Sequence, residues 1–250
     1  MNQRIQKLRN DSLNAVNCIS VERAFLITNY YKKHMGRVTS AAALRAGAFK
    51  YILENKKVEV FGDELIVGER GPKPKAVPTY PEITIHLLED LEILNSREKV
   101  SYQVDDETRK IYKEVIIPFW KGRNQREKMM KVLGGEWLDA YESGIFTEFQ
   151  EQRTPGHTVN GKKIYSQGMK DIMDEIDSNL NRIDYFNDPF ALEKVEELKA
   201  MKTAAEALVH FANRYAKELE SLAKEENRKW RKAELVKMAE ICKRVPAHAP

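Results

Sequence analysis

The chain has 250 residues, 42% of them hydrophobic and 32% charged, which allows a packed core and excludes wholesale disorder. It contains no apolar run near the ~20 residues that a membrane-spanning helix needs, and its polar start lacks the apolar centre of a secretory signal. Its two cysteines, Cys18 and Cys242, cannot build a disulfide framework and belong to no metal-ligand cluster. These features predict a protein of the reducing cytoplasm without a membrane partner.

The net charge of +4 is concentrated near the end of the sequence. Residues 224–244 contain eight basic and four acidic residues. Because the acids are interleaved with the basic residues, we interpret this stretch as the solvated face of a helix, and no nucleic-acid partner is predicted. A contact with a polyanion is the alternative.

The first third of the chain is expected to be largely helical. An apolar stripe marks a first helix, and its members are Ile5, Leu8, Leu13 and Val16. Ser20 is expected to be the N-cap of a second helix over residues 21–34, and an alanine-rich helix is expected over 40–54. The β-branched residues that alternate around Gly62-Asp63 predict a hairpin over 58–70.

The middle of the chain alternates between loops and helices. Residues 71–81 contain four prolines and are expected to form a loop, because proline removes a backbone donor. Helices are expected over 83–94, over 105–133 with an interruption at Pro118, and over 135–146.

Beyond a second hairpin candidate at 159–165, the chain is expected to be almost wholly helical. Apolar residues recur in steps of three and four, as in a seam that faces a neighbouring helix; they are Leu198, Met201, Ala205, Leu208, Ala212, Tyr215, Leu219 and Leu222. This spacing predicts one long helix, against which a following helix with Leu235, Met238 and Ile241 could pack. Seams of this type are usually structural.

The run FTEFQEQRTPGHT at 146–158 carries the most specific signal. Proline restricts the residue before it, and glycine adopts backbone angles that other residues avoid. His157 therefore follows a sharp turn, which suits a group that must meet a ligand at a set angle. Taken alone, a histidine in such a turn is more often a structural hydrogen-bonding group.

This run resembles a segment of glycyl radical enzymes of the dehydratase and C–heteroatom lyase type. Three further stretches extend the resemblance over essentially the whole chain: ELIVGE at 64–69, PTYPEITIHLLEDLEIL at 78–94 and IIPFWKGR at 116–123. Among the branches of the family, the chain most resembles trans-4-hydroxyproline dehydratases.

The resemblance implies a fold as well as a chemistry. Residues 1–250 would be the N-terminal portion of a pyruvate formate-lyase-like domain, mainly α with a few short β-strands. In the parent enzyme, meaning the whole protein of which this chain would be a part, such helices wrap the outside of a β/α barrel that is incomplete here. We therefore expect the isolated chain to expose an apolar surface and to associate.

The resemblance also implies what the chain lacks. Such enzymes need a cysteine that becomes a thiyl radical, with a glutamate two residues after it in dehydratases, and a glycine near the C-terminus that stores the radical. Cys18 and Cys242 are followed two places on by Ser20 and Arg244, and no RVxGY-like motif is present. The chain alone is therefore predicted to be inactive and to bind no cofactor. The parent would receive its glycyl radical from an activating enzyme that uses S-adenosylmethionine and an iron–sulfur cluster.

Two residues of the run match positions of the substrate pocket in the family. His157 matches the histidine that contacts the leaving hydroxyl, and an imidazole can donate a proton near neutral pH. Phe149 matches an aromatic position that lines the pocket in the hydroxyproline branch, although it could equally be an ordinary core residue. These two are the candidate substrate-binding residues, with His157 as the candidate catalytic proton donor.

Other polar residues have weaker claims. Arg153 could clamp the loop through Glu148 or Glu151, and we favour that role over substrate contact. Tyr80, Pro81 and Glu82 are interpreted as buried loop structure. His86 lies four residues after Glu82 on an expected helix, but a pair without a third ligand is not a metal site.

The primary hypothesis is a fragment of a radical dehydratase from the cytoplasm of an anaerobe. Its partners would be a small hydroxylated substrate such as trans-4-hydroxyproline, the activating enzyme and the remainder of the barrel; a homodimer is left open. Relatives that act on choline, diols or sulfonates, or as formate C-acetyltransferases, are alternatives within the family. A non-enzymatic module that binds a partner helix through the 198–222 seam is the alternative from another class.

Overall fold

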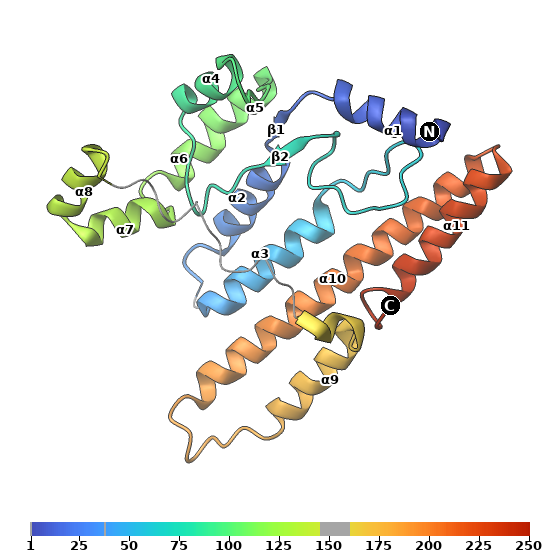
Figure 1. Ribbon diagram of the computed structural model, residues 1–250. Coiled ribbons are helices and arrows are strands. Elements are labelled where there is room, and N and C mark those ends of the chain that lie inside the picture. The colour runs from blue at the N-terminus through green and yellow to red at the C-terminus, as the bar shows by residue number, and fades with distance from the viewer. Residues whose placement is uncertain (1, 38, 146–160) are drawn as a thin grey trace.

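The computed structural model describes residues 2–37, 39–145 and 161–250, and within these ranges it is mainly helical with two very short strands (Figure 1). This confirms the predicted fold class. In chain order the elements are α1 (Gln3–Asn14), β1 (Cys18–Ser20), α2 (Glu22–His34), α3 (Ala41–Asn55), β2 (Ala76–Pro78), α4 (Leu88–Ser96), α5 (Asp106–Ile111), the π-helix η1 (Tyr112–Ile116), α6 (Ile117–Trp120), α7 (Gln125–Leu133), α8 (Gly135–Glu142), the 3-10 helix η2 (Gly161–Tyr165), α9 (Met169–Leu180), α10 (Ala191–Glu225) and α11 (Lys229–Arg244).

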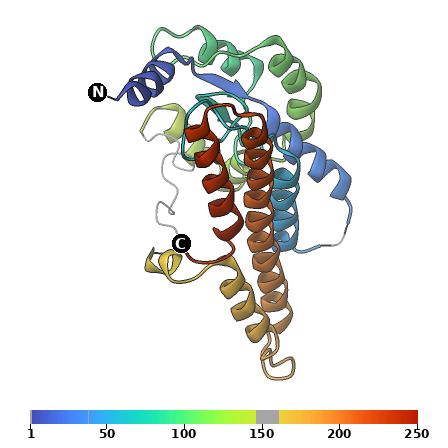
Figure 2. The same cartoon turned by 90° about the vertical axis from the view of Figure 1, so that its right-hand side faces the viewer.

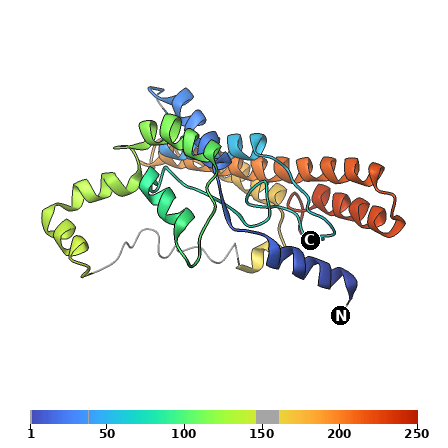
Figure 3. The same cartoon turned by 90° about the horizontal axis from the view of Figure 1, so that it is seen from above.

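The predicted long helix is confirmed as α10, which is 35 residues long. It packs along α3, α9 and α11, and α11 runs back beside it as expected (Figure 2). Leu219, Leu235 and Met238 are buried between α10 and α11. Seen from above, α7 and α8 extend away from the α10–α11 pair (Figure 3).

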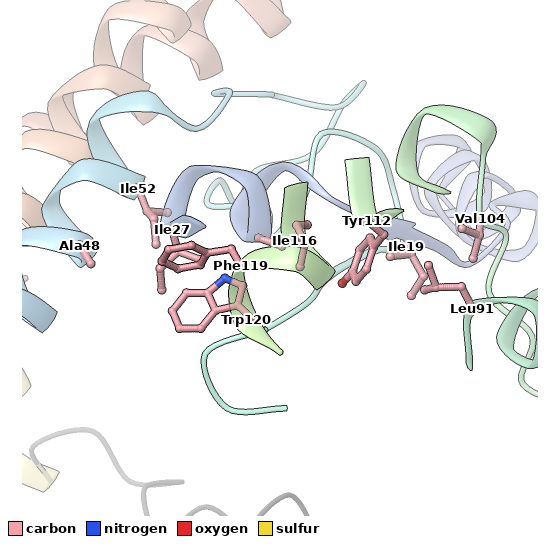
Figure 4. Close-up of a cluster of buried hydrophobic side chains, with 11 residues drawn as sticks. Ile19, Ile27, Ala48, Ile52, Leu91, Val104, Tyr112, Ile116, Phe119 and Trp120 are labelled. Atoms are coloured by element: carbon pink, nitrogen blue, oxygen red, sulfur yellow. The ribbon is translucent and has the colours of Figure 1, made fainter. Parts of the chain in front are cut away.

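The largest apolar cluster joins α2, α3, η1 and α6 with the start of α4 (Figure 4). Its polar groups are satisfied internally. The Trp120 indole donates to the Thr28 hydroxyl at 2.8 Å, and that hydroxyl donates to the Ala24 carbonyl at 2.6 Å. The Tyr112 hydroxyl donates to the Thr79 hydroxyl at 2.6 Å. Because buried polar groups without partners are costly, these bonds fix how the elements meet.

The two strands were missed from the sequence. β1 and β2 pair in parallel, with Cys18 opposite Ala76 and Ser20 opposite Pro78, so a strand lies inside the proline-rich segment that was expected to be a loop. Ser20 belongs to β1, and Val21 occupies the N-cap position of α2 without a side-chain hydrogen bond. The prediction of Ser20 as a cap was therefore wrong, because its backbone is committed to the sheet.

The hairpin predicted over 58–70 was also wrong. All of these residues are described, and they form no strand. The backbone is held from outside instead: Arg231 donates to the Gly62 carbonyl at 3.0 Å and Arg4 donates to the Asp63 carbonyl at 2.9 Å. Val60 and Val67 pack against the α10–α11 pair. Tertiary contacts of this kind replace the cross-strand bonds that the alternating pattern suggested.

The helices of the middle segment follow the sequence with shifted boundaries. The helix expected over 83–94 begins only at Leu88, because the Glu82 and Ile83 carbonyls accept hydrogen bonds from the amides of Gln125 and Arg126, at 2.9 and 3.0 Å. The interruption expected at Pro118 was misplaced, because Pro118 lies inside α6 and the helical run breaks at residues 121–124. Pro118 lacks an amide hydrogen, and the turn before it is a π-helix in which the Ile117 amide donates to the Tyr112 carbonyl.

The second hairpin candidate, predicted over 159–165, was wrong for the residues that the structure describes. Residues 159–160 lie outside the described ranges, and residues 161–165 form η2.

The start of α9 contacts the turn that follows α11. The amides of Met169 and Lys170 donate to the carbonyls of Pro246 and Ala247 in this turn, at 2.8 and 3.0 Å. Gly168 lies so close to this turn that a Cβ there would overlap the Ala247 carbonyl and the His248 Cα.

Candidate functional site

The residues that the sequence singles out most strongly lie outside the described ranges. These are Phe149 and His157, together with the neighbouring Glu148, Glu151 and Arg153. Their assignment to a substrate pocket therefore stays a prediction.

Within the described ranges, the main concave feature is a cavity of about 1030 Å³. It lies between α2, α3, the 78–83 stretch and the segment from Trp120 to Val132. Two helix faces supply much of its wall. Arg23, Ile27 and Tyr31 are spaced by four residues along α2, so they share one face. A similar face of α3 carries Arg45, Phe49 and Ile52 and ends at Lys56.

An arginine–carboxylate pair fixes one side of this cavity. The Arg23 guanidinium donates to both Glu82 carboxylate oxygens, at 2.5 and 3.2 Å, and to the Thr79 carbonyl at 3.1 Å. It also lies 3.8 Å from the centre of the Tyr80 ring. Bidentate pairing and stacking are the interactions for which a planar guanidinium is suited. The pair therefore orients the 79–82 stretch against α2.

The interpretation of the 80–82 run as buried loop structure holds only in part. Pro81 is buried, but the Tyr80 side chain is 45% exposed at the mouth of the cavity. His86 does not lie on a helix, because α4 begins at Leu88. Among residues 2–37, 39–145 and 161–250, no three histidine, cysteine, aspartate or glutamate side chains are grouped as a metal site requires.

Two titratable groups of the cavity have a pKa shifted by burial. Burial raises the pKa of the Tyr31 hydroxyl, so this group stays protonated at neutral pH. Burial also lowers the pKa of Lys56, whose ammonium donates to the Glu69 carbonyl at 2.7 Å. Glu82, as shown above, is engaged by Arg23. The described lining residues thus offer cationic and apolar contacts.

Neither cysteine has the properties of an activated nucleophilic thiol. Both are free, and burial raises the pKa of each thiol, whereas reactive thiols have a lowered pKa. Cys18 is held in β1 and Cys242 in α11. This agrees with the sequence, in which neither cysteine precedes the expected glutamate.

Sequence reasoning did not identify the cavity. The sequence pattern of α3 could have indicated it, because one face of this helix combines basic and apolar side chains; they are Arg45, Phe49, Ile52 and Lys56. The Arg23–Glu82 pair, by contrast, joins residues 59 positions apart, and no local pattern connects them.

In the described residues, no helix has both the length and the apolar character to cross a membrane.

Comparison with known proteins gives these features a family context. The family model described as pyruvate formate lyase-like matches residues 1–250. The trans-4-hydroxy-L-proline dehydratase of Clostridioides difficile is 46% identical over 248 residues, which make up 99% of this chain and 31% of that protein.

Solved structures agree on the fold. The crystal structure of hydroxyproline dehydratase from Clostridioides difficile with trans-4-hydroxy-L-proline bound matches with a TM-score of 0.93 at 46% identity, covering 99% of this chain and 31% of that one. The glycerol-bound form of the B12-independent glycerol dehydratase from Clostridium butyricum matches with a TM-score of 0.92 at 29% identity. This match covers 100% of this chain and 32% of that one. The chain thus spans about a third of the length of these relatives. The resemblance inferred from the motifs is confirmed, and the chain belongs to the pyruvate formate lyase-like family.

Proposed function

We propose that this chain is the N-terminal part of a glycyl radical enzyme that eliminates water from a small hydroxylated substrate, with trans-4-hydroxyproline as the first compound to test. The observation that carries the proposal is the 46% identity to a trans-4-hydroxy-L-proline dehydratase over 99% of the chain. Because the chain spans 31% of that relative, the activity is proposed for the parent enzyme, and residues 1–250 alone are expected to be inactive.

The radical chemistry belongs to parts of the parent enzyme outside residues 1–250. A glycyl radical, installed by an activating enzyme that uses S-adenosylmethionine and an iron–sulfur cluster, would supply hydrogen abstraction through a cysteine. The sequence supports placing that cysteine elsewhere, because Cys18 and Cys242 are followed two places on by Ser20 and Arg244. We also propose the cytoplasm of an anaerobe as the setting, since carbon- and sulfur-centred radicals are destroyed by oxygen.

Two residues of this chain are proposed to act on the substrate. His157 would hydrogen-bond the hydroxyl that leaves and give it a proton, so that it departs as water. Phe149 would form an apolar wall that keeps solvent from the radical intermediate. Support for both comes from the match of the 146–158 run to the family, and from the 46% identity around it.

The alternative of a helical interaction module has lost its main feature. The module required a free seam on the long helix, but Ala205, Tyr215 and Leu219 of α10 are buried, and α10 packs against α3, α9 and α11; of the seam, Met201 is exposed. Much of the seam is therefore used inside the chain. Family members that act on other alcohols remain alternatives, because the glycerol dehydratase structure matches almost as well.

A chimeric enzyme tests the proposal. Residues 1–250 would replace the matched region of the Clostridioides difficile dehydratase, and the chimera would be activated without oxygen and supplied with trans-4-hydroxyproline. We expect dehydration together with a glycyl radical signal in electron paramagnetic resonance. A chimera that holds the radical but dehydrates glycerol, and not hydroxyproline, would shift the assignment to a diol dehydratase.

The role of His157 is tested in the same chimera. His157→Gln removes the proton donor but keeps a polar side chain, so we expect turnover to fall about 10²- to 10⁴-fold, as for loss of a general acid. The radical signal should be unchanged, because no radical-bearing group is altered. His210→Gln is the matched control, since His210 is exposed on α10. Full turnover by the His157 variant would contradict the proposed role.

A further inference from the structure

The cavity between α2 and α3 carries positive charge that the described residues do not neutralise. Six basic and two acidic side chains line it; the basic ones are Arg23, Arg45, Lys56, Arg70, Arg123 and Lys128. One of the two acids is already paired with a basic side chain, and the other keeps its charge. Glu82 pairs with Arg23, and Glu22 accepts a hydrogen bond from the Lys57 amide at 2.8 Å.

Three of the basic side chains are free to bind a new partner. Arg45, Arg70 and Lys128 are exposed, and within the described ranges no ion pair or side-chain hydrogen bond involves any of them. They reach the cavity from α3, from the stretch after α3 and from α7. Positive charge from three separate elements therefore converges on one space, which favours an acidic occupant.

The wall beneath this charge is apolar. Ile27, Ile52 and Trp120 are buried in it, whereas Phe49 is 38% exposed and Val132 is 84% exposed. A small hydrated anion gains nothing from such a wall. An occupant that carries large apolar side chains as well as carboxylates would cover it and remove that surface from water.

We propose that this cavity holds an acidic and apolar segment of the polypeptide that makes up the rest of the parent enzyme. The inference rests on the proposed function, because it requires the two thirds of a dehydratase that lie beyond the region matched by this chain. The volume of about 1030 Å³ lies at the upper end of the range for small-molecule pockets, about 300–1,000 Å³, and suits several residues of a peptide.

Labelled peptides test this docking. Overlapping fluorescein-labelled peptides would tile the part of the Clostridioides difficile dehydratase outside the matched region, and fluorescence anisotropy would measure their binding to the 250-residue chain. We expect the strongest binder to contain both carboxylates and large apolar residues, and its affinity to fall as salt rises.

Two sets of variants connect binding to the cavity. The double variant Arg45→Gln/Lys128→Gln removes two unpaired charges, and we expect the peptide affinity to fall about three- to tenfold. Arg9→Gln/Lys199→Gln removes the same two residue types from exposed positions outside the cavity and should leave affinity unchanged. Val132→Ser reduces the apolar wall and should weaken peptide binding about two- to fivefold.

Several results would overturn the inference. Absence of any bound peptide, preference for basic peptides, or equal losses in the two double variants would each do so. Inorganic phosphate serves as the competitor: if it displaces the peptide, and binds Val132→Ser as well as the unaltered chain, the cavity is a site for small anions. Because this assay needs no radical, its failure is distinct from loss of dehydratase activity in the chimera.

Discussion

At the scale of single residues, a few buried hydroxyl contacts fix the relation of distant segments. Thr28 and Thr79 bind Trp120 and Tyr112, which lie 92 and 33 residues away in the sequence. The sequence shows that Trp120 and Tyr112 are large and apolar enough to be buried, but not which hydroxyl each would find. Such partners are set by three-dimensional packing, and one sequence without its contacts cannot specify them.

Tyr112 also gives the core a measurable pH dependence. Burial raises the pKa of its hydroxyl from 10.0 to about 12. The protonated form is thus favoured in the folded state, so its contribution is fully present below pH ~10 and is lost as the pH rises towards 12. A shift of this size corresponds to roughly 2–3 kcal/mol.

We therefore expect the free energy of unfolding in urea to fall more steeply between pH 10 and 12 in the unaltered chain than in Tyr112→Phe, since phenylalanine has no hydroxyl to ionise. Tyr185→Phe, at an exposed position, should follow the unaltered chain. Parallel curves for all three proteins would show that the Tyr112 hydroxyl is not the responsible group.

The candidate site could be predicted only in pieces. The 146–158 run was recognisable because proline, glycine and histidine follow one another in a restrictive order. The mixed face of α3 was readable at helical spacing, yet its meaning depends on α2, α7 and the 78–83 stretch meeting it. Arg70 and Lys128 have no local feature that distinguishes them from ordinary surface residues.

At the scale of elements, periodic helices were predictable and contact-dependent segments were not. α10 and α11 follow directly from apolar spacing, and α3 begins where Ser40 caps it, with the Ala43 amide donating to its hydroxyl at 3.1 Å. The predictions for the start of α4 and for residues 58–70 were wrong, because hydrogen bonds from Gln125, Arg4 and Arg231 determine the backbone conformation there. Those donors lie far away in the sequence.

The close packing of Gly168, just before α9, against the turn after α11 can be tested by adding one methyl group to this glycine. Gly168→Ala would push a Cβ into the backbone of Ala247 and His248, which cannot yield as a flexible side chain would. We expect a loss of about 1–3 kcal/mol, typical of overpacking, measured by thermal or urea unfolding.

Gly135→Ala is the matched control for this change. Gly135 begins α8, and a Cβ there would meet nothing within 4 Å. Alanine also favours helix over glycine, so this variant should be neutral or slightly more stable. Equal stability of the two variants would mean that the C-terminal turn does not press on Gly168.

At the scale of the whole molecule, large apolar side chains remain exposed on several elements. Examples are Phe186 in the α9–α10 loop, Ile66 in the 58–70 stretch and Ile145 just after α8. Since the relatives are about three times longer, we infer that much of this surface is covered in the parent enzyme. Scattered exposure is ordinary, but extended apolar surface promotes association.

We therefore expect the purified 250-residue chain to form oligomers or aggregates as its concentration rises, measured by static light scattering. The chimera described above should scatter as a defined particle, because the remainder of the dehydratase would cover the same surface. A stable monomer of the isolated chain at high concentration would show that its helices form a self-sufficient core.

The contacts around residues 62 and 63 connect the two ends of the described chain. Arg4 in α1 pairs with Glu234 in α11 at 2.6 Å, and Glu234 also accepts from the buried Arg231 at 3.1 Å. Both arginines hold the same short turn. Removal of α1 would consequently disturb α11, so expression designs should leave residues 1–14 intact.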